Sequence, residues 1–139
     1  MQAKNGDFYG TTSSGGAHLV GTVFKITPSG TLTTLYSFCS LPNCADGSMP
    51  FAGLVQATNH DLYGTTVYGG LTDNGQNQGS GTIFRITPNG NLTTIHSFCS
   101  LANCADGVLP FSGLIQARNG LFYGTTWAGD PFGTVFSLK

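Results

Sequence analysis

The sequence contains three copies of one short unit, and this repetition constrains the fold more than any other feature. Residues 21–30, Gly-Thr-Val-Phe-Lys-Ile-Thr-Pro-Ser-Gly, return at 81–90 as Gly-Thr-Ile-Phe-Arg-Ile-Thr-Pro-Asn-Gly and begin again at Gly133. The motif Tyr-Gly-Thr-Thr also occurs three times, starting at Tyr9, Tyr63 and Tyr123. Repetition on this scale indicates equivalent units that bury a common core by stacking on one another.

The second unit is the most complete, and its pattern is typical of β-strands. In the equivalent segment of the first unit, Thr22, Phe24 and Ile26 alternate with Val23, Lys25 and Thr27, which is the two-residue period of a strand. Charged residues make up 8% of the chain and 21 residues are glycine, a bias that favours strands joined by tight turns over helices. We therefore expect four strands in this unit, at residues 53–57, 62–66, 81–87 and 92–98.

Successive four-stranded meanders predict an all-β fold made of β-propeller-type blades, the last of which lacks its outer strand. A β-prism or a β-trefoil also uses three four-stranded repeats and is the alternative. The chain is expected to form a single repeat domain, residues 1–139, with blade 1 at about 1–38, blade 2 at about 53–98, blade 3 at about 113–139, and loops at 39–52 and 99–112 between them.

Three blades do not normally close a ring, so two apolar blade faces would meet water. The simplest remedy is self-association, and we expect a homodimer that closes a six-bladed ring. A head-to-tail filament is the alternative, because heterologous contacts that miss closure propagate.

Several polar and aromatic residues recur in register. The glutamines on the predicted first strand, Gln2, Gln56 and Gln116, are expected to hydrogen-bond neighbouring backbone more readily than to line a channel. The tyrosines of the Tyr-Gly-Thr-Thr motifs and the phenylalanines Phe24, Phe84 and Phe136 are expected to pack between blades.

The four cysteines form two pairs with the same spacing. Because Cys39 and Cys44, like Cys99 and Cys104, are five residues apart, each pair can close a small disulfide loop. Zinc ligation is the rival, but zinc knuckles are usually tighter and often include histidine. Disulfides are the favoured interpretation, and they point to an oxidising compartment.

No set of residues predicts catalysis. One aspartate follows each cysteine pair, Asp46 and Asp106, which is too few carboxylates for a strong calcium site and fits an Asp-Gly turn. The acidic residues form no evident pair, and no Ser/His/Asp or Cys/His group recurs. We expect a protein that is not an enzyme and holds no cofactor or metal.

The two loops that vary in length, 67–80 and 127–132, are the best candidates for ligand binding, because loops on a rigid scaffold often carry recognition. Their amides, acids and aromatic rings suit glycans, which makes a lectin-like propeller the alternative function. In the competing interpretation Trp127 only caps a blade edge. The candidate residues are Tyr68, Asp73, Asn74, Gln76, Asn77, Trp127 and Asp130.

Charge and hydropathy exclude two classes of partner. The five basic residues are spread along the chain and the net charge is −1, so nucleic acid is not expected. No apolar run approaches the roughly 18 residues of a membrane helix, so membrane insertion is not expected. The chain starts inside a repeat, at Met1-Gln2-Ala3-Lys4, and we expect targeting and anchor segments to be absent from it.

The ordered series Asp-Gly-x-x-Pro-x-x-Gly-Leu-Val/Ile-Gln-Ala, Phe/Leu-Tyr-Gly-Thr-Thr, Gly-Thr-Val-Phe-Lys-Ile-Thr-Pro-Ser-Gly and Leu-Thr-Thr-Leu-Tyr-Ser-Phe resembles the Gloeo/Verruco (GloVer) tandem repeats over essentially the whole chain. This resemblance implies a secreted or cell-surface bacterial repeat protein, and it brings no catalytic residues. The predicted function is therefore an extracellular structural or interaction module that associates through its open blade faces.

Overall fold

The computed structural model describes residues 1–72, 78–129 and 131–139, and in this part of the chain the long elements are all strands. The first sheet contains β1 (Phe8–Thr12), β2 (Thr22–Ile26) and β3 (Leu32–Ser37). The second contains β4 (Val55–Gln56), β5 (Leu62–Thr66), β6 (Thr82–Ile86) and β7 (Leu92–Ser97). The third contains β8 (Ile115–Gln116), β9 (Phe122–Thr125) and β10 (Val135–Leu138). Two 3-10 turns, η1 (Pro42–Cys44) and η2 (Ala102–Cys104), lie between the sheets.

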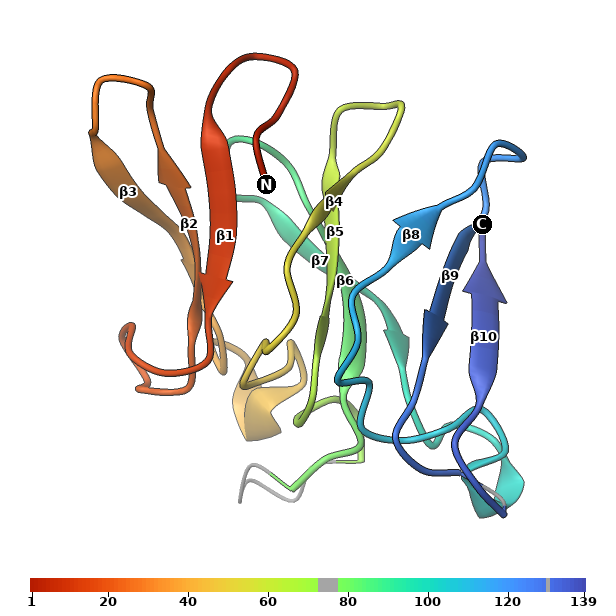
Figure 1. Cartoon of the computed structure of the whole chain (residues 1–139). Coiled ribbons are helices and arrows are strands. Elements are labelled where there is room, and N and C mark those ends of the chain that lie inside the picture. The colour runs from red at the N-terminus through yellow and green to blue at the C-terminus, as the bar shows by residue number, and fades with distance from the viewer. Residues whose placement is uncertain (73–77, 130) are drawn as a thin grey trace.

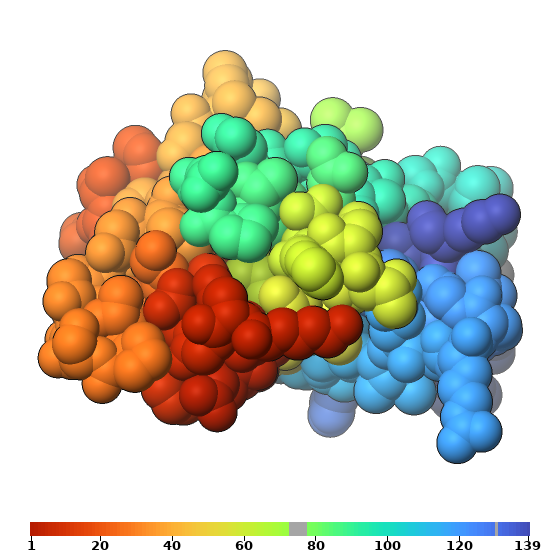
Figure 2. Space-filling model, turned by 90° about the horizontal axis from the view of Figure 1, so that it is seen from above, coloured from red at the N-terminus to blue at the C-terminus, as the bar shows by residue number. Residues whose placement is uncertain are grey.

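Each sheet is antiparallel and follows chain order, with strand orders β1-β2-β3, β4-β5-β6-β7 and β8-β9-β10. The prediction of an all-β meander repeat is confirmed. The three sheets lie side by side, so the first and third units form opposite ends of the molecule and the second lies between them (Figures 1 and 2).

The first strand of each unit, expected at residues 53–57 in the second unit, is shorter in the structure. In the second and third units it pairs over only two residues, and in the first unit it is a single bridge between Gln2 and Phe8. Met1 holds this bridge in place, because its amino group donates to the carbonyl of Tyr9 and its own carbonyl accepts from the Tyr9 N–H. Beyond each short strand the backbone turns back at once, since the N–H of Ala57 bonds to the carbonyl of Asp61.

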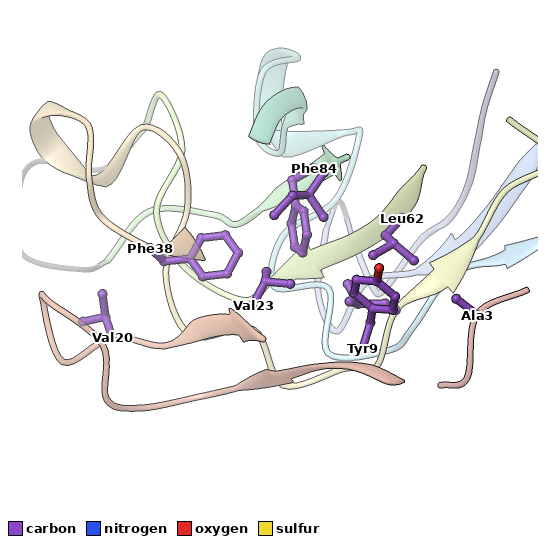
Figure 3. Close-up of a cluster of buried hydrophobic side chains, with 9 residues drawn as sticks. Ala3, Tyr9, Val20, Val23, Phe38, Leu62 and Phe84 are labelled. Carbon is purple, nitrogen blue, oxygen red and sulfur yellow. The ribbon is translucent and has the colours of Figure 1, made fainter. Parts of the chain in front are cut away.

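The hydrophobic core consists of the junctions between sheets. In the first junction Tyr9, Val23 and Phe38 of the first unit meet Leu62 and Phe84 of the second (Figure 3). The second junction repeats this arrangement, with Tyr63, Ile83 and Phe98 facing Leu114 and Phe122. No unit therefore buries its apolar side chains without a neighbour, which is the property the repeats predicted.

The predicted packing between units is confirmed for Tyr9, Tyr63, Phe84 and Phe136, whereas Phe24 and Tyr123 belong to neither buried cluster. The rings of Phe38 and Phe84 lie 5.1 Å apart, as do those of Phe98 and Phe136, with the same interplanar angle of 64°. The third contact is a stack of Tyr63 on Phe122 at 4.3 Å. Edge-to-face and stacked pairs of this kind add to the burial of the rings themselves.

The glycine of each Tyr-Gly-Thr-Thr motif makes room for a phenylalanine ring on the neighbouring strand. Gly10, Gly64 and Gly124 lie opposite Phe24, Phe84 and Phe136 in the strand register. A Cβ atom on Gly64 would come within 2.6 Å of the Phe84 ring and 2.8 Å of Leu54 Cδ2. The ring thus covers the bare backbone of the glycine, which explains why both residues recur.

Replacing this glycine should destabilise the protein without any change in charge. Gly64→Ala is expected to lower the free energy of unfolding by about 1–3 kcal/mol, because the added methyl overpacks a fully buried site. Urea denaturation followed by circular dichroism measures the loss. Gly53→Ala is the matched control, since a Cβ at Gly53 meets nothing within 4 Å, and it should change stability by less than about 0.5 kcal/mol. Equal losses in the two variants would contradict this role for the ring.

Candidate interaction surfaces

Every sheet has two faces: a leading face, on the side of the preceding unit, and a trailing face, on the side of the following unit. In the second unit Leu62, Phe84 and Ile86 belong to the leading face and Tyr63 and Ile83 to the trailing face. Alternation along each strand separates the two sets, because successive side chains point to opposite sides of a sheet. At each junction the trailing face of one unit packs against the leading face of the next.

Two faces have no neighbouring unit in the described structure: the leading face of the first unit and the trailing face of the third. Val23 and Ile83 on trailing faces are 0% and 1% exposed, whereas Val135, at the same position of the third unit, is 79% exposed. Leu62 and Phe122 on leading faces are 0% and 3% exposed, whereas Phe8, their counterpart in the first unit, is 42% exposed. Leu32 of the first sheet and Ile115 of the third are exposed as well. The open leading face therefore belongs to the first unit and the open trailing face to the third.

The recurring glutamines link neighbouring units through backbone hydrogen bonds. Gln56 Oε1 accepts from the N–H of Lys4 at 3.0 Å, and Gln116 Oε1 accepts from the N–H of Thr58 at 3.3 Å. Each glutamine also donates through Nε2 to a carbonyl of its own turn, as Gln2 does to Gly6. The expected bonding of the glutamines to backbone is confirmed.

The series of hydrogen bonds from backbone N–H groups to glutamine side chains leaves one group unpaired at each end of the described chain. Among the described residues Gln2 Oε1 has no donor from a preceding unit, and the N–H of Arg118, the counterpart of Lys4 and Thr58, has no acceptor in a following one. These two groups lie on the open leading and open trailing sides respectively. They are therefore complementary in hydrogen bonding as the faces are in shape.

The loops between units are closed by the predicted disulfides, Cys39–Cys44 and Cys99–Cys104. Each loop then joins the units on either side of it. Met49 donates its N–H to Val20 of the first unit and accepts from the N–H of Val67 of the second. Leu109 makes the same pair of bonds, to the Ser80 carbonyl and from the Trp127 N–H. The bridged loops are thus structural clamps between successive sheets.

Asp46 organises the first clamp. Its fully buried carboxylate accepts hydrogen bonds from the Tyr36 hydroxyl at 2.8 Å and from the N–H groups of Ser40 and Leu41 at 2.9 and 3.1 Å. Burial first, and then the hydrogen bond to the Asp46 carboxylate and its negative charge, together raise the pKa of Tyr36 to about 12. The carboxylate therefore holds the loop together, a more specific role than the Asp-Gly turn that the sequence suggested.

Asp106 has the same position in the second clamp, but His96 replaces the tyrosine. Its carboxylate lies 3.0 Å from His96 Nε2 and accepts from the hydroxyl and N–H of Ser100 and the N–H of Leu101. Burial alone would raise the pKa of Asp106, but these donors outweigh it and leave the pKa below its ordinary value. The second clamp is more open than the first, with 11% of the Asp106 side chain exposed.

The ligand candidates named from the sequence are only partly visible. Asp73, Asn74, Gln76, Asn77 and Asp130 lie outside the described residues. Tyr68 is half-buried and pairs through its backbone with Ser48 in the first clamp. The Trp127 side chain is 73% exposed, and among the described residues it makes no ring contact with Tyr68.

An aromatic row that includes Trp127 was not predicted. The Phe111 ring lies 6.2 Å from Trp127 and 5.8 Å from Phe51, and all three side chains are exposed. Phe51 and Phe111 follow the prolines of equivalent loops, Pro50 and Pro110, so comparing the two loops could have revealed the pair. The row depends on how the units are placed, which no single repeat shows.

The described part of the chain offers neither a cluster of metal ligands nor a membrane-spanning helix. Across residues 1–72, 78–129 and 131–139, no three His, Cys, Asp or Glu side chains are grouped closely enough to hold a metal ion. The same residues include no helix with the length and apolarity to span a membrane.

Three equivalent antiparallel sheets, joined by bridged clamps and packed face to face, define an all-β tandem-repeat protein. The Gloeobacter/Verrucomicrobia repeat family matches residues 1–139, the whole chain, and the protein belongs to this family. The resemblance seen in the sequence is thereby confirmed. The comparison with curated proteins gives no match.

Proposed function

We propose that this protein is an extracellular structural and interaction module whose open leading and trailing faces pair between copies to complete a propeller. The observation that carries the proposal is the exposure of Phe8 and Val135 at positions that are buried in every internal junction. An apolar side chain left in water at a site built for burial favours association. The two disulfides support an oxidising, extracellular location.

The internal junctions indicate how two copies would meet. Phe122 stacks on Tyr63, so Phe8 of one copy is expected to stack on Tyr123 of another. The N–H of Arg118 in the copy that supplies Tyr123 would then reach Gln2 Oε1 of the copy that supplies Phe8, as the Thr58 N–H reaches Gln116 Oε1. Two copies that make this contact twice close a six-bladed ring with twofold symmetry, whereas a contact that misses closure gives a filament.

Two single substitutions and their mixture test this pairing. Phe8→Asp and Val135→Asp each place a charge on one face, and each should weaken self-association by about 100-fold, as hot-spot losses of 2–3 kcal/mol do. Mixed in equal amounts, the two variants should form a heterodimer, because one intact leading face then meets one intact trailing face. Sedimentation velocity distinguishes these outcomes. A mixture that stays monomeric while the unmodified protein associates would exclude head-to-tail pairing.

A second candidate function is glycan binding, and the aromatic row of Phe51, Phe111 and Trp127 favours it. Exposed rings offer apolar faces on which sugar rings can stack, and the loops 67–80 and 127–132 would add polar groups. A glycan array probed with the unmodified protein and with Trp127→Ala tests this proposal. Signals lost in the variant would support it, and an array without signal for either protein would exclude it for the glycans displayed.

A further inference from the structure

The third sheet carries an open slot beside β10. The second sheet has four strands, with β7 along the outer edge of β6, whereas β10 is the last strand of the third sheet in the described chain. A cavity of about 270 Å³ lies at that edge. Its apolar walls come from Ile83, Ile95 and Phe98 of the second unit and from Phe136 and Leu138 of β10.

The first junction shows what fills such a slot. There Leu92 of β7 packs against the same buried cluster as Leu35 and Tyr36, which are the counterparts of Ile95 and His96. Without a strand in the second slot, Ile95 is 40% exposed. The missing cover also accounts for the more open second clamp, because Asp106 lines the cavity whereas its counterpart Asp46 is fully buried.

The backbone of β10 is free to pair along the same edge. The N–H of Thr126 bonds to the carbonyl of Thr134, so the backbone groups of Thr134 point toward β9. The backbone groups of successive residues point to opposite edges of an antiparallel strand. The N–H and C=O groups of Val135 and Ser137 therefore point into the slot. Within the described part of the chain these groups have no partner, and an edge with such donors and acceptors beside an apolar cavity is the arrangement that binds peptides by strand addition.

We propose that this slot binds an extended peptide with the sequence pattern of the repeat's own fourth strand, antiparallel to β10. The side chain equivalent to Leu92 would fill the cavity, and the residue equivalent to Thr93 would pair with Ser137, as Thr93 pairs with Arg85 in the second sheet. This site is distinct from the open faces of the proposed function, because it lies along a strand edge inside the second junction.

A peptide of residues 88–98 is the probe, titrated into the Phe8→Asp variant so that binding is measured without self-association. Isothermal titration should show saturable binding, and amide hydrogen exchange at Val135 and Ser137 should slow. Leu92→Asp in the peptide should weaken binding at least about tenfold, because it removes the buried leucine.

Backbone pairing is tested with two N-methylated peptides that are identical in composition. The N–H of Thr87 bonds to the carbonyl of Asn91, so alternation directs the Thr93 N–H toward the receptor strand and the Thr94 N–H away from it. Methylation at Thr93 should therefore abolish binding, while methylation at Thr94 should have little effect. Equal effects at the two positions would overturn the proposal in favour of nonspecific apolar adhesion.

Fusing the peptide to the protein makes its binding intramolecular, which lowers the entropic cost of bringing the two together. Residues 88–98 appended after Lys139 should slow exchange at Val135 and Ser137, and this protection counts as support even where the free peptide binds too weakly to titrate. Unchanged exchange at both amides in the fused chain would overturn the proposal. Since this readout is independent of oligomeric state, it does not depend on whether the open faces pair.

Discussion

Phe84→Ala should lower the free energy of unfolding by about 3–5 kcal/mol, a large fraction of the stability of a domain this size. Phe84 is 0% exposed and lies in the first junction, where its ring covers Gly64 and meets Phe38 edge to face. Truncation removes the ring from both partners and leaves a cavity between two sheets that cannot close without moving one of them. Urea denaturation under non-reducing conditions measures the loss.

The repeat supplies its own control for this experiment. Phe24 has the same position in the first sheet and covers Gly10, but it lies on the open leading face and is only half-buried. Phe24→Ala should cost about 1–2 kcal/mol when measured on the Phe8→Asp background, where association is weakened. A loss as large as that of Phe84→Ala would contradict the assignment of the junctions as the core of the protein.

Asp46→Asn is expected to lower the free energy of unfolding by about 3 kcal/mol, although it changes only one atom. The carboxylate accepts from Tyr36, Ser40 and Leu41, and an amide nitrogen at either position would face at least one of these donors. A buried donor left without an acceptor costs about 1–3 kcal/mol, and the charge-assisted bond is lost as well. Thermal unfolding followed by circular dichroism would show the difference as a lower Tm.

Asp106→Asn is the matched control, because the second clamp is partly open to water. Its loss should be about 1–2 kcal/mol, since water can satisfy a donor that the amide leaves unpaired. Losing as much stability in Asp106→Asn as in Asp46→Asn would show that burial does not set the strength of these clamps.

The strand order and both disulfides were predictable because they depend on local patterns. The alternation of Val23, Phe24 and Lys25 indicates a strand whatever its neighbours are, and a separation of five positions from Cys39 to Cys44 allows a bridge within one turn. The two-residue extent of β4 was not predictable, because the apolar side chains of Leu54 and Ala57 continue past the point where the backbone turns away.

The surfaces between units were harder to predict than the units. The sequence could not show that the Asp46 carboxylate caps Ser40 and Leu41, because an Asp-Gly pair reads as a turn in any context. Nor could it show that Phe111 of one loop meets Phe51 of another 60 residues away along the chain. The first feature depends on how the bridged loop folds back on itself, because Asp46 lies only five or six residues beyond Leu41 and Ser40. The second depends on how successive units are placed, which arises from packing rather than from local preference.

The mass of the native protein in solution, measured by light scattering over a range of concentrations, tests the pairing of open faces most directly. Pairing into a closed ring predicts that the mass rises to a plateau at twice the 14.5 kDa of a single chain. A mass that stays at 14.5 kDa at every concentration would contradict it, because Phe8 and Val135 would then remain in water without a partner.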